Sequence, residues 1–298
     1  HKTMDSYYKY FDEDVHTYAP SDDETENIFR AKYSRKIKSK TSYGAHFDYE
    51  GVDDDAVLDV SQTCALDSDL DHAAPLLVSC DFNKGINTAT VSQWHDNFLR
   101  WGKCLVTLNT FYNFNDGIEG VIEQICRYYC FKTHKDVVFI YDSTAKQGGA
   151  YATREAESTR FYNKAKTVFT QHGWKCTLHY IGQTMSHADK YTLVNEVFAG
   201  KKGFVPLINR YNNDLLIASM QNSKVYYDKG GMRKDKRLEK KVVNNEDEQV
   251  RLNATDITDA YDTTLIACVK NGGNFKGGGM SGAGWGMQGC KVRKPQLL

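Results

Sequence analysis

The chain has 298 residues, of which 41% are hydrophobic and 26% charged, as is ordinary for a folded globular protein. No apolar run approaches the roughly 20 residues that cross a bilayer and no signal peptide opens the chain, so neither a membrane-spanning helix nor a secretion signal is predicted. The formal net charge of zero conceals a split, because residues 1–75 hold 17 acidic and 8 basic residues and the remainder holds 21 acidic and 30 basic residues.

The first 72 residues show weak periodicity and many Asp, Ser and Tyr residues, which favours an acidic lead-in or linker that is partly ordered. We expect a folded domain over residues 73–272 and a flexible, glycine-rich tail over residues 273–298. The chain starts with His rather than Met, so we expect a piece of a longer protein. The eight cysteines form no CxxC pair, which argues against a zinc knuckle and favours reduced thiols in a cytosolic compartment.

Within the folded domain, the pattern predicts strands first and then alternating strands and helices. Strands are expected at residues 76–82, 86–95, 103–114, 136–141 and 174–182. Helices are expected at residues 115–132, 153–173, 186–201 and about 255–270. The run at 136–141 lacks alternation, which indicates a central strand that is buried on both faces.

This order of elements predicts an α/β fold with a mixed central sheet of at least five strands, flanked by helices, in which the first three strands are antiparallel. It is the order of the ribonuclease H-like fold. In that fold, a carboxylate on the first strand and another at the end of the fourth lie side by side, and a third comes from a late helix.

Two of the predicted strands end on an aspartate. Asp81 ends the run "PLLVSCDF", and Asp142 ends "VVFIYD". If the two strands are adjacent and parallel, both carboxylates lie at one edge of the sheet, where ligands bind in open α/β sheets. Two carboxylates so close would repel each other unless a cation lay between them. Hard oxygen ligands favour Mg²⁺ or Mn²⁺ over zinc.

The third carboxylate is expected from the helix "TDITDAYDTTLIACV". Asp259 lies nearly opposite the apolar stripe of this helix, with Asp256 and Asp262 about 60° to either side, given about 3.6 residues per turn. We favour Asp259 as a metal ligand. Asp262 is a rival candidate, whereas Asp256 is most simply an acidic residue that complements the helix dipole, although it is also kept as a candidate ligand.

The three motifs "LLVSCDFN", "VVFIYDSTAKQGG" and "TDITDAYDTTLIACV", in this order and spacing, resemble the nuclease domain of the tailed-phage terminase large subunit. The similarity covers about residues 75–270. It includes Asp142-Ser143, Asp259-Ala260-Tyr261 and the Lys-rich segment 234–240. The His that the family places three residues before the last aspartate is Asp256 in this chain, and no GxxxxGK[ST] loop is present, so ATP hydrolysis by that route is not expected.

The resemblance implies a metal-dependent endonuclease that cleaves concatemeric double-stranded DNA with weak sequence specificity. It implies two Mg²⁺ or Mn²⁺ ions, with Asp81 bridging both and Asp142 and Asp259 each helping to hold one. It implies an upstream ATPase domain, with the portal and the small terminase subunit as further partners, and the cytoplasm of an infected bacterial host as the location.

Basic residues cluster at residues 223–241, which favours binding of a polyanion, although a solvated charged face explains the charge equally well. Residues expected to contact phosphates are Lys146, Lys224, Lys229, Arg233, Lys234, Lys236 and Arg237. Two alternatives stay open: another ribonuclease H-like nuclease, such as a junction resolvase, and a non-catalytic DNA-binding module of the packaging machinery.

Overall fold

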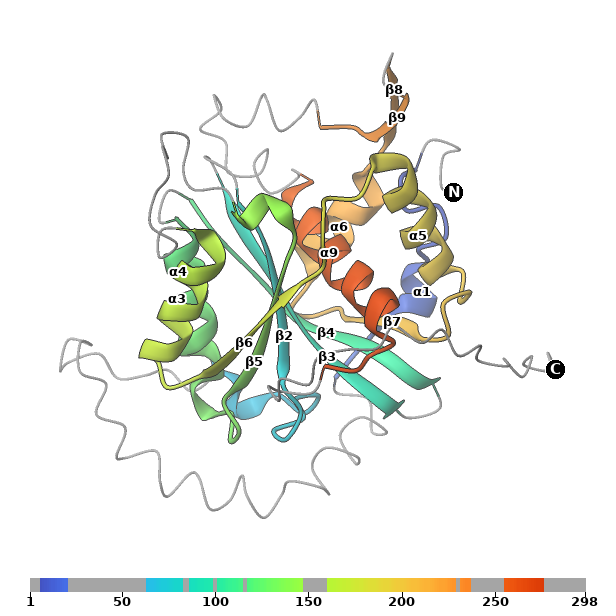
Figure 1. Ribbon diagram of the computed structural model, residues 1–298. Helices are drawn as coiled ribbons and strands as arrows, with labels where there is room; N and C mark the ends of the chain where they lie inside the picture. Colours follow the sequence, from blue (N-terminus) through green and yellow to red (C-terminus); the bar gives the residue numbers. More distant parts are fainter. Residues whose placement is uncertain are drawn as a thin grey trace.

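The structure is a computed structural model. It describes residues 6–20, 63–82, 86–98, 101–114, 117–146, 160–228, 231–236 and 255–275. Within these residues the chain forms a central mixed sheet with helices on both faces (Figure 1). In these ranges, no helix has both the length and the apolar character to span a membrane.

In the described part of the chain, seven strands form one sheet, in the order β1-β7-β4-β3-β2-β5-β6. The strands are β1 (Thr17–Tyr18), β2 (Leu76–Phe82), β3 (Asn87–Phe98), β4 (Gly102–Asn113), β5 (Asp136–Tyr141), β6 (Lys175–Tyr180) and β7 (Val205–Asn209). Strands β2, β3 and β4 are antiparallel, whereas β5 is parallel to β2, and β6 to β5. The predicted fold class, ribonuclease H-like with an antiparallel first half, is confirmed by this order.

The register of the central strands determines where the two strand-end aspartates lie. The parallel pairing of β2 with β5 runs from Leu76 opposite Val137 to Ser79 opposite Ile140. Continued by two residues, this register brings Asp81 level with Asp142. The residues of β5 from 137 to 140 are all buried, as the absence of alternation predicted, because helices cover both faces of this strand.

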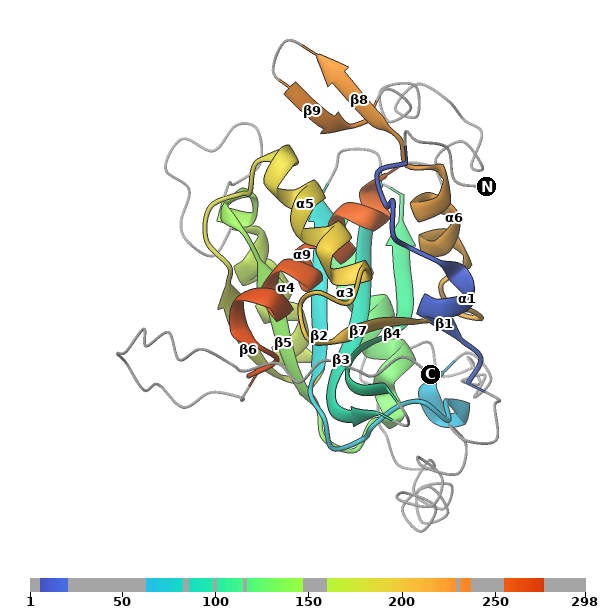
Figure 2. The same ribbon diagram turned by 90° about the vertical axis from the view of Figure 1, so that its right-hand side faces the viewer.

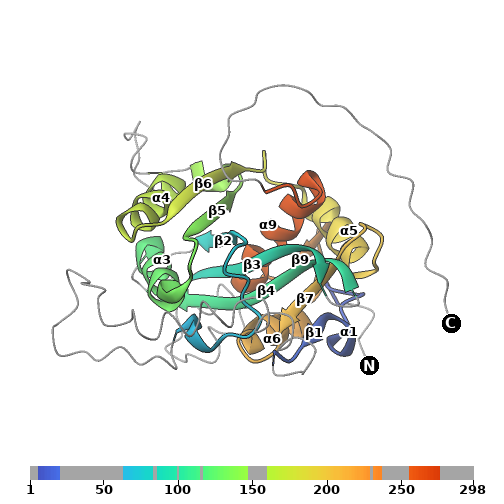
Figure 3. The same ribbon diagram turned by 90° about the horizontal axis from the view of Figure 1, so that it is seen from below.

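Two hydrophobic cores lie on opposite faces of the sheet (Figures 1 and 3). The longer helices are α3 (Gly117–Tyr128), α4 (Phe161–Gln171), α5 (His187–Phe198), α6 (Asp214–Asn222) and α9 (Asp256–Asn271). The first two pack on one face and the last three on the other. Strand β2 contributes to both cores, because Leu76 and Val78 point to the first core and Leu77 to the second.

Shorter elements complete the described chain. They are α1 (Glu13–His16), the 3₁₀ turns η2 (Cys64–Leu66), η4 (Tyr129–Phe131) and η5 (Ser143–Lys146), and the strands β8 (Val225–Asp228) and β9 (Gly231–Lys234). Strands β8 and β9 pair as an antiparallel ribbon that projects from the body next to α5 (Figure 2). The basic segment therefore begins with a hairpin, which was not predicted.

The N-terminal residues are more ordered than predicted. Tyr7, Tyr8 and Phe11 are at most 1% exposed and belong to the core beneath α9. Strand β1 extends the sheet by pairing with β7. Residues 1–72 were predicted to be a partly ordered lead-in, and aromatic side chains of residues 6–18 are part of the same core. Residues 21–62 and the glycine-rich segment from 276 onward lie outside the described residues.

Helix α9 is fixed against β2 by a buried hydroxyl. Ser79 Oγ donates a hydrogen bond to the Ala260 carbonyl, at 2.6 Å, and shares another of 2.6 Å with Thr264 Oγ1. At its far end the helix stops at Gly272, whose φ of 58° is left-handed. Because Ser79 precedes Asp81 by two residues on the same strand and Asp259 precedes Ala260, this contact brings the two aspartates to the same edge.

Candidate metal and phosphate site

A pocket of about 340 Å³ opens where β2 and β5 end. It is lined by Cys80, Asp81, Tyr141, Asp142, Thr144, Ala145, Thr184, His187, Lys190, Lys236, Asp259 and Thr263. The aspartates come from β2, from the residue after β5 and from α9. The structure therefore brings Asp81, Asp142 and Asp259 together around one pocket, whereas their roles in metal binding and catalysis remain predictions.

Hydrogen bonds from two segments orient the carboxylate of Asp142. Its Oδ1 accepts from the Thr144 amide at 2.8 Å and from Thr144 Oγ1 at 2.5 Å. Its Oδ2 accepts from Thr184 Oγ1 at 3.0 Å. Thr184 belongs to the loop between β6 and α5, and Ser143 joins this loop to the turn after β5. The small polar residues that follow β5 therefore hold Asp142 in one orientation.

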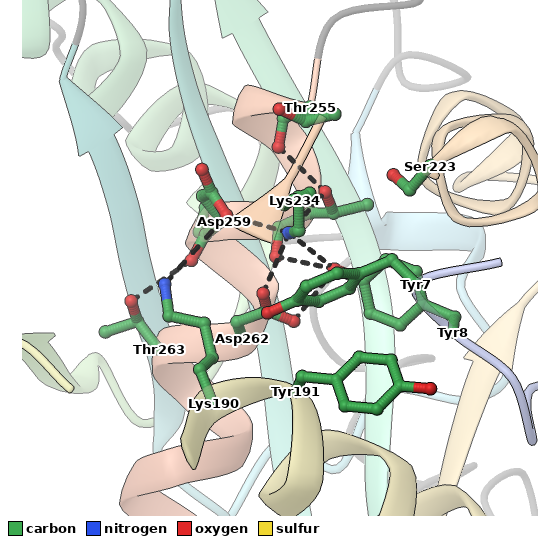
Figure 4. Close-up of polar contacts among 12 residues, drawn as sticks. Tyr7, Tyr8, Lys190, Tyr191, Ser223, Lys234, Thr255, Asp259, Asp262 and Thr263 are labelled. Carbon is green, nitrogen blue, oxygen red and sulfur yellow. Dashed lines mark hydrogen bonds and ion pairs between the residues drawn. The ribbon is translucent and has the colours of Figure 1, made fainter. Parts of the chain in front are cut away.

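Ammonium groups surround the carboxylate of Asp259, whose side chain is 12% exposed (Figure 4). Lys234 Nζ lies 2.7 Å from Oδ1, and Lys190 Nζ lies 4.0 Å from the same atom. Lys236 Nζ forms an ion pair with Oδ2. Burial alone would raise the pKa of Asp259, but the charges of Lys234, Lys236 and Lys190 hold it below its usual range.

Lys234 lies in a buried polar network behind the pocket (Figure 4). Its side chain is 1% exposed, and its ammonium group donates to Tyr8 Oη, Thr258 Oγ1 and Asp262 Oδ2 at 2.8, 3.0 and 2.8 Å. Tyr8 Oη donates in turn to Asp262 Oδ1 at 2.9 Å. Burial would lower the pKa of Lys234, but the carboxylates of Asp259 and Asp262 raise it above its usual value.

The structure separates the other acidic candidates of α9 from the pocket. Asp262 is fully buried, and its carboxylate is bonded to Tyr8 and Lys234. Asp256 is 2% exposed at the first residue of the helix. Neither residue lines the pocket. That either of them binds metal stays a prediction. At Asp262, Tyr8 and Lys234 cover the side of α9 that faces away from the sheet.

The residues predicted to contact phosphates fall into different environments. Lys236 lines the pocket, and Lys146 is exposed with its Nζ 3.4 Å from the centre of the Tyr180 ring. Lys224 and Arg233 are exposed on or beside the β8–β9 ribbon. The prediction for Lys234 is wrong, because burial in the network keeps it from any phosphate. Lys229 and Arg237 lie outside the described residues.

Three of the pocket residues that were not predicted are polar side chains on α5 or just before it. Lys190 and His187 lie three residues apart on α5, so they share a face of the helix that points into the pocket. Burial, followed by the charge of Lys190, lowers the pKa of His187. Thr184 precedes the helix and contacts Asp142. No local pattern marks these residues, because α5 reaches the pocket through its packing on α9.

The donor chemistry of the pocket fits the divalent metal ions that the resemblance implies. Asp81, Asp142 and Asp259 supply oxygen ligands, and Lys236 already places a positive charge on Asp259 Oδ2 within the pocket. Across the described residues, no three His, Cys, Asp or Glu side chains lie close enough together to hold a metal ion. Metal binding therefore requires the carboxylates to draw together and Lys236 to leave Oδ2.

Comparison with known proteins adds little to this geometry. No known family and no curated protein matches the sequence. Among solved structures, the chain is similar to one described as "Thermus thermophilus RuvC structure", with 8% identity over 65% of this chain and 93% of that chain, and a TM-score of 0.26. At so low a score, the fold assignment depends on the strand order and not on this likeness.

Proposed function

We propose that the chain is a divalent-metal-dependent endonuclease that cleaves double-stranded DNA. The observation that carries the proposal is the meeting of Asp81, Asp142 and Asp259 at one pocket, from two adjacent parallel strands and the helix that crosses them. Carboxylates that converge at the carboxyl ends of parallel strands favour metal-assisted chemistry on a ligand bound at that edge.

The charge of the pocket supports a phosphodiester substrate. Lys190 and Lys236 line the same pocket as the aspartates. When an anionic backbone enters, these ammonium groups are free to exchange their contact with Asp259 for contacts with phosphate oxygens. Such contacts give affinity that falls with salt and carries no sequence information. The exposed Lys146, in the turn after Asp142, would extend this binding along the duplex.

Within this proposal the aspartates hold the metal ions. Asp81, Asp142 and Asp259 would be the ligands, and bound ions would supply an activated water and stabilise the charge of the departing oxygen. Thr144 and Thr184 keep the Asp142 carboxylate in its orientation. His187 also lines the pocket, and its pKa is lowered. Its neutral ring is therefore suited to accept a proton near the metal ligands.

The finer assignment rests on the sequence motifs. We propose that the natural substrate is concatemeric viral DNA, cut during genome packaging in the cytoplasm of an infected bacterium. The partners in this proposal are an upstream ATPase domain, the portal and the small terminase subunit. Their support is the resemblance of the segments around Asp81, Asp142 and Asp259 to the terminase nuclease domain.

The proposal is tested by plasmid nicking. In Mn²⁺, the wild-type chain should nick and then linearise supercoiled plasmid, and Asp81→Asn should reduce nicking to the level of the metal-free reaction without changing the circular dichroism spectrum. Asp136→Asn is the matched control, since Asp136 begins β5 at the opposite edge of the sheet. Cleavage retained by Asp81→Asn would refute the assignment of this residue.

Two further assays separate the alternatives. A preference for four-way junctions over linear duplex would favour a resolvase over a packaging nuclease. Calorimetry with Mn²⁺ addresses the non-catalytic alternative, because a DNA-binding module whose acids merely end strands should give no heat with the wild-type chain. The nuclease proposal expects Mn²⁺ binding that Asp142→Asn weakens.

A further inference from the structure

Lys234 contacts a candidate metal ligand from behind the pocket. It ends β9, and its ammonium group lies on the side of Asp259 that faces Tyr8 and Asp262 (Figure 4). Its side chain is 1% exposed and it does not line the pocket. In this arrangement a phosphate or a substrate group in the pocket does not contact Lys234, so a role of Lys234 in the site is exerted through its neighbours.

The two oxygens of Asp259 face different surroundings. Oδ1 accepts a hydrogen bond of 2.7 Å from Lys234, inside the protein, whereas the Nζ of the pocket residue Lys190 lies farther from the same atom, at 4.0 Å. Oδ2 pairs with Lys236, which lines the pocket. An aspartate without such a contact rotates about its side-chain bonds and can present either oxygen, or both, to a ligand. The bond from Lys234 removes this freedom and leaves Oδ2 facing the pocket.

The ammonium group of Lys234 is also held by contacts that do not involve Asp259. Thr258 Oγ1, Tyr8 Oη and Asp262 Oδ2 lie within 3.0 Å of Lys234 Nζ, whose three N–H groups are shared among these atoms and Asp259 Oδ1. The rings of Tyr7 and Tyr8 lie 4.8 and 5.1 Å from the same nitrogen. These contacts come from the N-terminal segment and from α9, so the ammonium group keeps its place when the pocket side of Asp259 exchanges partners.

We propose that Lys234 is a positioning residue of the site, which holds Oδ1 of Asp259 inside the protein so that Oδ2 alone is presented to a divalent cation. This inference rests on the proposed function. It follows the general rule that partners behind a metal ligand fix its orientation, and that their loss lowers metal affinity by about 10–100-fold. The competing explanation is that Lys234 only neutralises the buried carboxylate of Asp262.

The test measures Mn²⁺ binding without DNA, by electron paramagnetic resonance of the free ion. The main variant is Lys234→Met/Asp262→Asn, which removes one positive and one negative buried charge and so leaves the charge around Asp259 balanced. The positioning role expects Mn²⁺ affinity to fall about 10-fold or more in this variant. Affinity within about twofold of wild type would overturn it, because a charge-neutralising role predicts no change there.

Tyr8→Phe is the matched control. It removes two hydrogen bonds of the same buried network, one to Asp262 and one from Lys234, but leaves the contact between Lys234 and Asp259 in place. Its melting temperature should fall while its Mn²⁺ affinity stays close to wild type. An equal loss of affinity in Tyr8→Phe would overturn the proposal, because general loosening of the core would then explain both variants.

A second measurement requires no variant and covers the case in which the double variant fails to fold. In a crystal structure of the wild-type chain with Mn²⁺, Asp259 should bind the ion through Oδ2, with Oδ1 still bonded to Lys234. Coordination through Oδ1 would overturn the inference while leaving the proposed nuclease intact. If the wild-type chain bound no Mn²⁺, the proposed function and this role of Lys234 would both fail.

Discussion

Two groups of buried acids lie in different parts of the molecule and are stabilised in different ways. On α9, Asp259 and Asp262 share the ammonium group of Lys234. In the segment before β2, the described hydrogen-bond partners of Asp67 and Asp69 are neutral. Asp67 accepts from Tyr128 at 3.0 Å, and Asp69 accepts from Tyr18 and Asn209 at 2.5 and 2.9 Å.

The difference in partners shifts the pKa of Asp259 and the pKa values of Asp67 and Asp69 in opposite directions. Cationic neighbours outweigh burial at Asp259, whose pKa lies below its usual range. Burial outweighs the neutral hydrogen bonds at the other group: it raises the pKa of Asp69, and it raises the pKa of Asp67 to about 7. A hydroxyl therefore orients a buried carboxylate, whereas keeping the carboxylate ionised requires a compensating charge. A candidate metal ligand must be ionised, and the lowered pKa of Asp259 meets that need.

The largest expected effect follows from removing the shared cation. Lys234→Met leaves Asp262 buried with the Tyr8 hydroxyl as its described partner, so the free energy of unfolding in urea should fall by about 3–5 kcal/mol. Lys146→Met, at an exposed position, should change it by less than about 0.5 kcal/mol. Adding Asp262→Asn to Lys234→Met should recover most of the loss. A Lys234→Met chain as stable as wild type would show that the buried carboxylates of α9 do not require the cation of Lys234.

A smaller effect is expected from the neutral group. Tyr18→Phe deletes the 2.5 Å hydrogen bond to Asp69, which retains its bond from Asn209. The free energy of unfolding should fall by about 1–3 kcal/mol, the cost of leaving one buried acceptor site unsatisfied. Tyr211→Phe is the control, because Tyr211 is 64% exposed. If both variants had the same urea midpoint of unfolding as wild type, the bond to Asp69 would contribute nothing to stability.

The pocket aspartates could be predicted because the sequence pattern that marks each of them lies in the residues next to it. Asp142 follows an unbroken apolar run and Asp81 a largely apolar one, and a central parallel pair of strands brings their ends together. Asp259 was also predicted, from its position opposite the apolar stripe of α9. The same helical reasoning kept Asp262 as a rival ligand, but it did not reveal that the Asp262 carboxylate is fully buried against Tyr8 and Lys234. A helix buried on more than one side has no free polar face, and periodicity alone does not reveal that.

The network behind the pocket could not be predicted, because its members are far apart in the sequence. Tyr8 and Asp262 are separated by 254 residues. Lys234 lies in a run of basic residues, a composition typical of a surface that binds phosphate. Its burial depends on the β8–β9 ribbon, which directs this side chain inward against Tyr8. The burial of the N-terminal aromatic residues was also not predicted, because the sequence around them is acidic and shows no clear periodicity.

The weakest expected effect is a pH dependence of stability that arises from Asp67. The pKa of Asp67 is about 7 in the folded chain and about 3.9 in an unfolded one. Between these values the folded chain retains a proton that the unfolded chain has released, so stability falls as the pH rises through this range. Asp67→Asn keeps an acceptor for Tyr128 but cannot ionise, so it should escape this loss.

The variant should therefore match wild type at pH 4 and exceed it at pH 8. The gain should be under about 1 kcal/mol, because Asp67 is only partly buried and solvent screens its charge. The measurement is the urea midpoint of both chains across this pH range. Asp136→Asn, at a partly exposed acid on β5, should track wild type throughout. A gain at pH 4 as large as at pH 8 would mean that the effect of the substitution does not depend on the ionisation of Asp67, which would contradict its raised pKa.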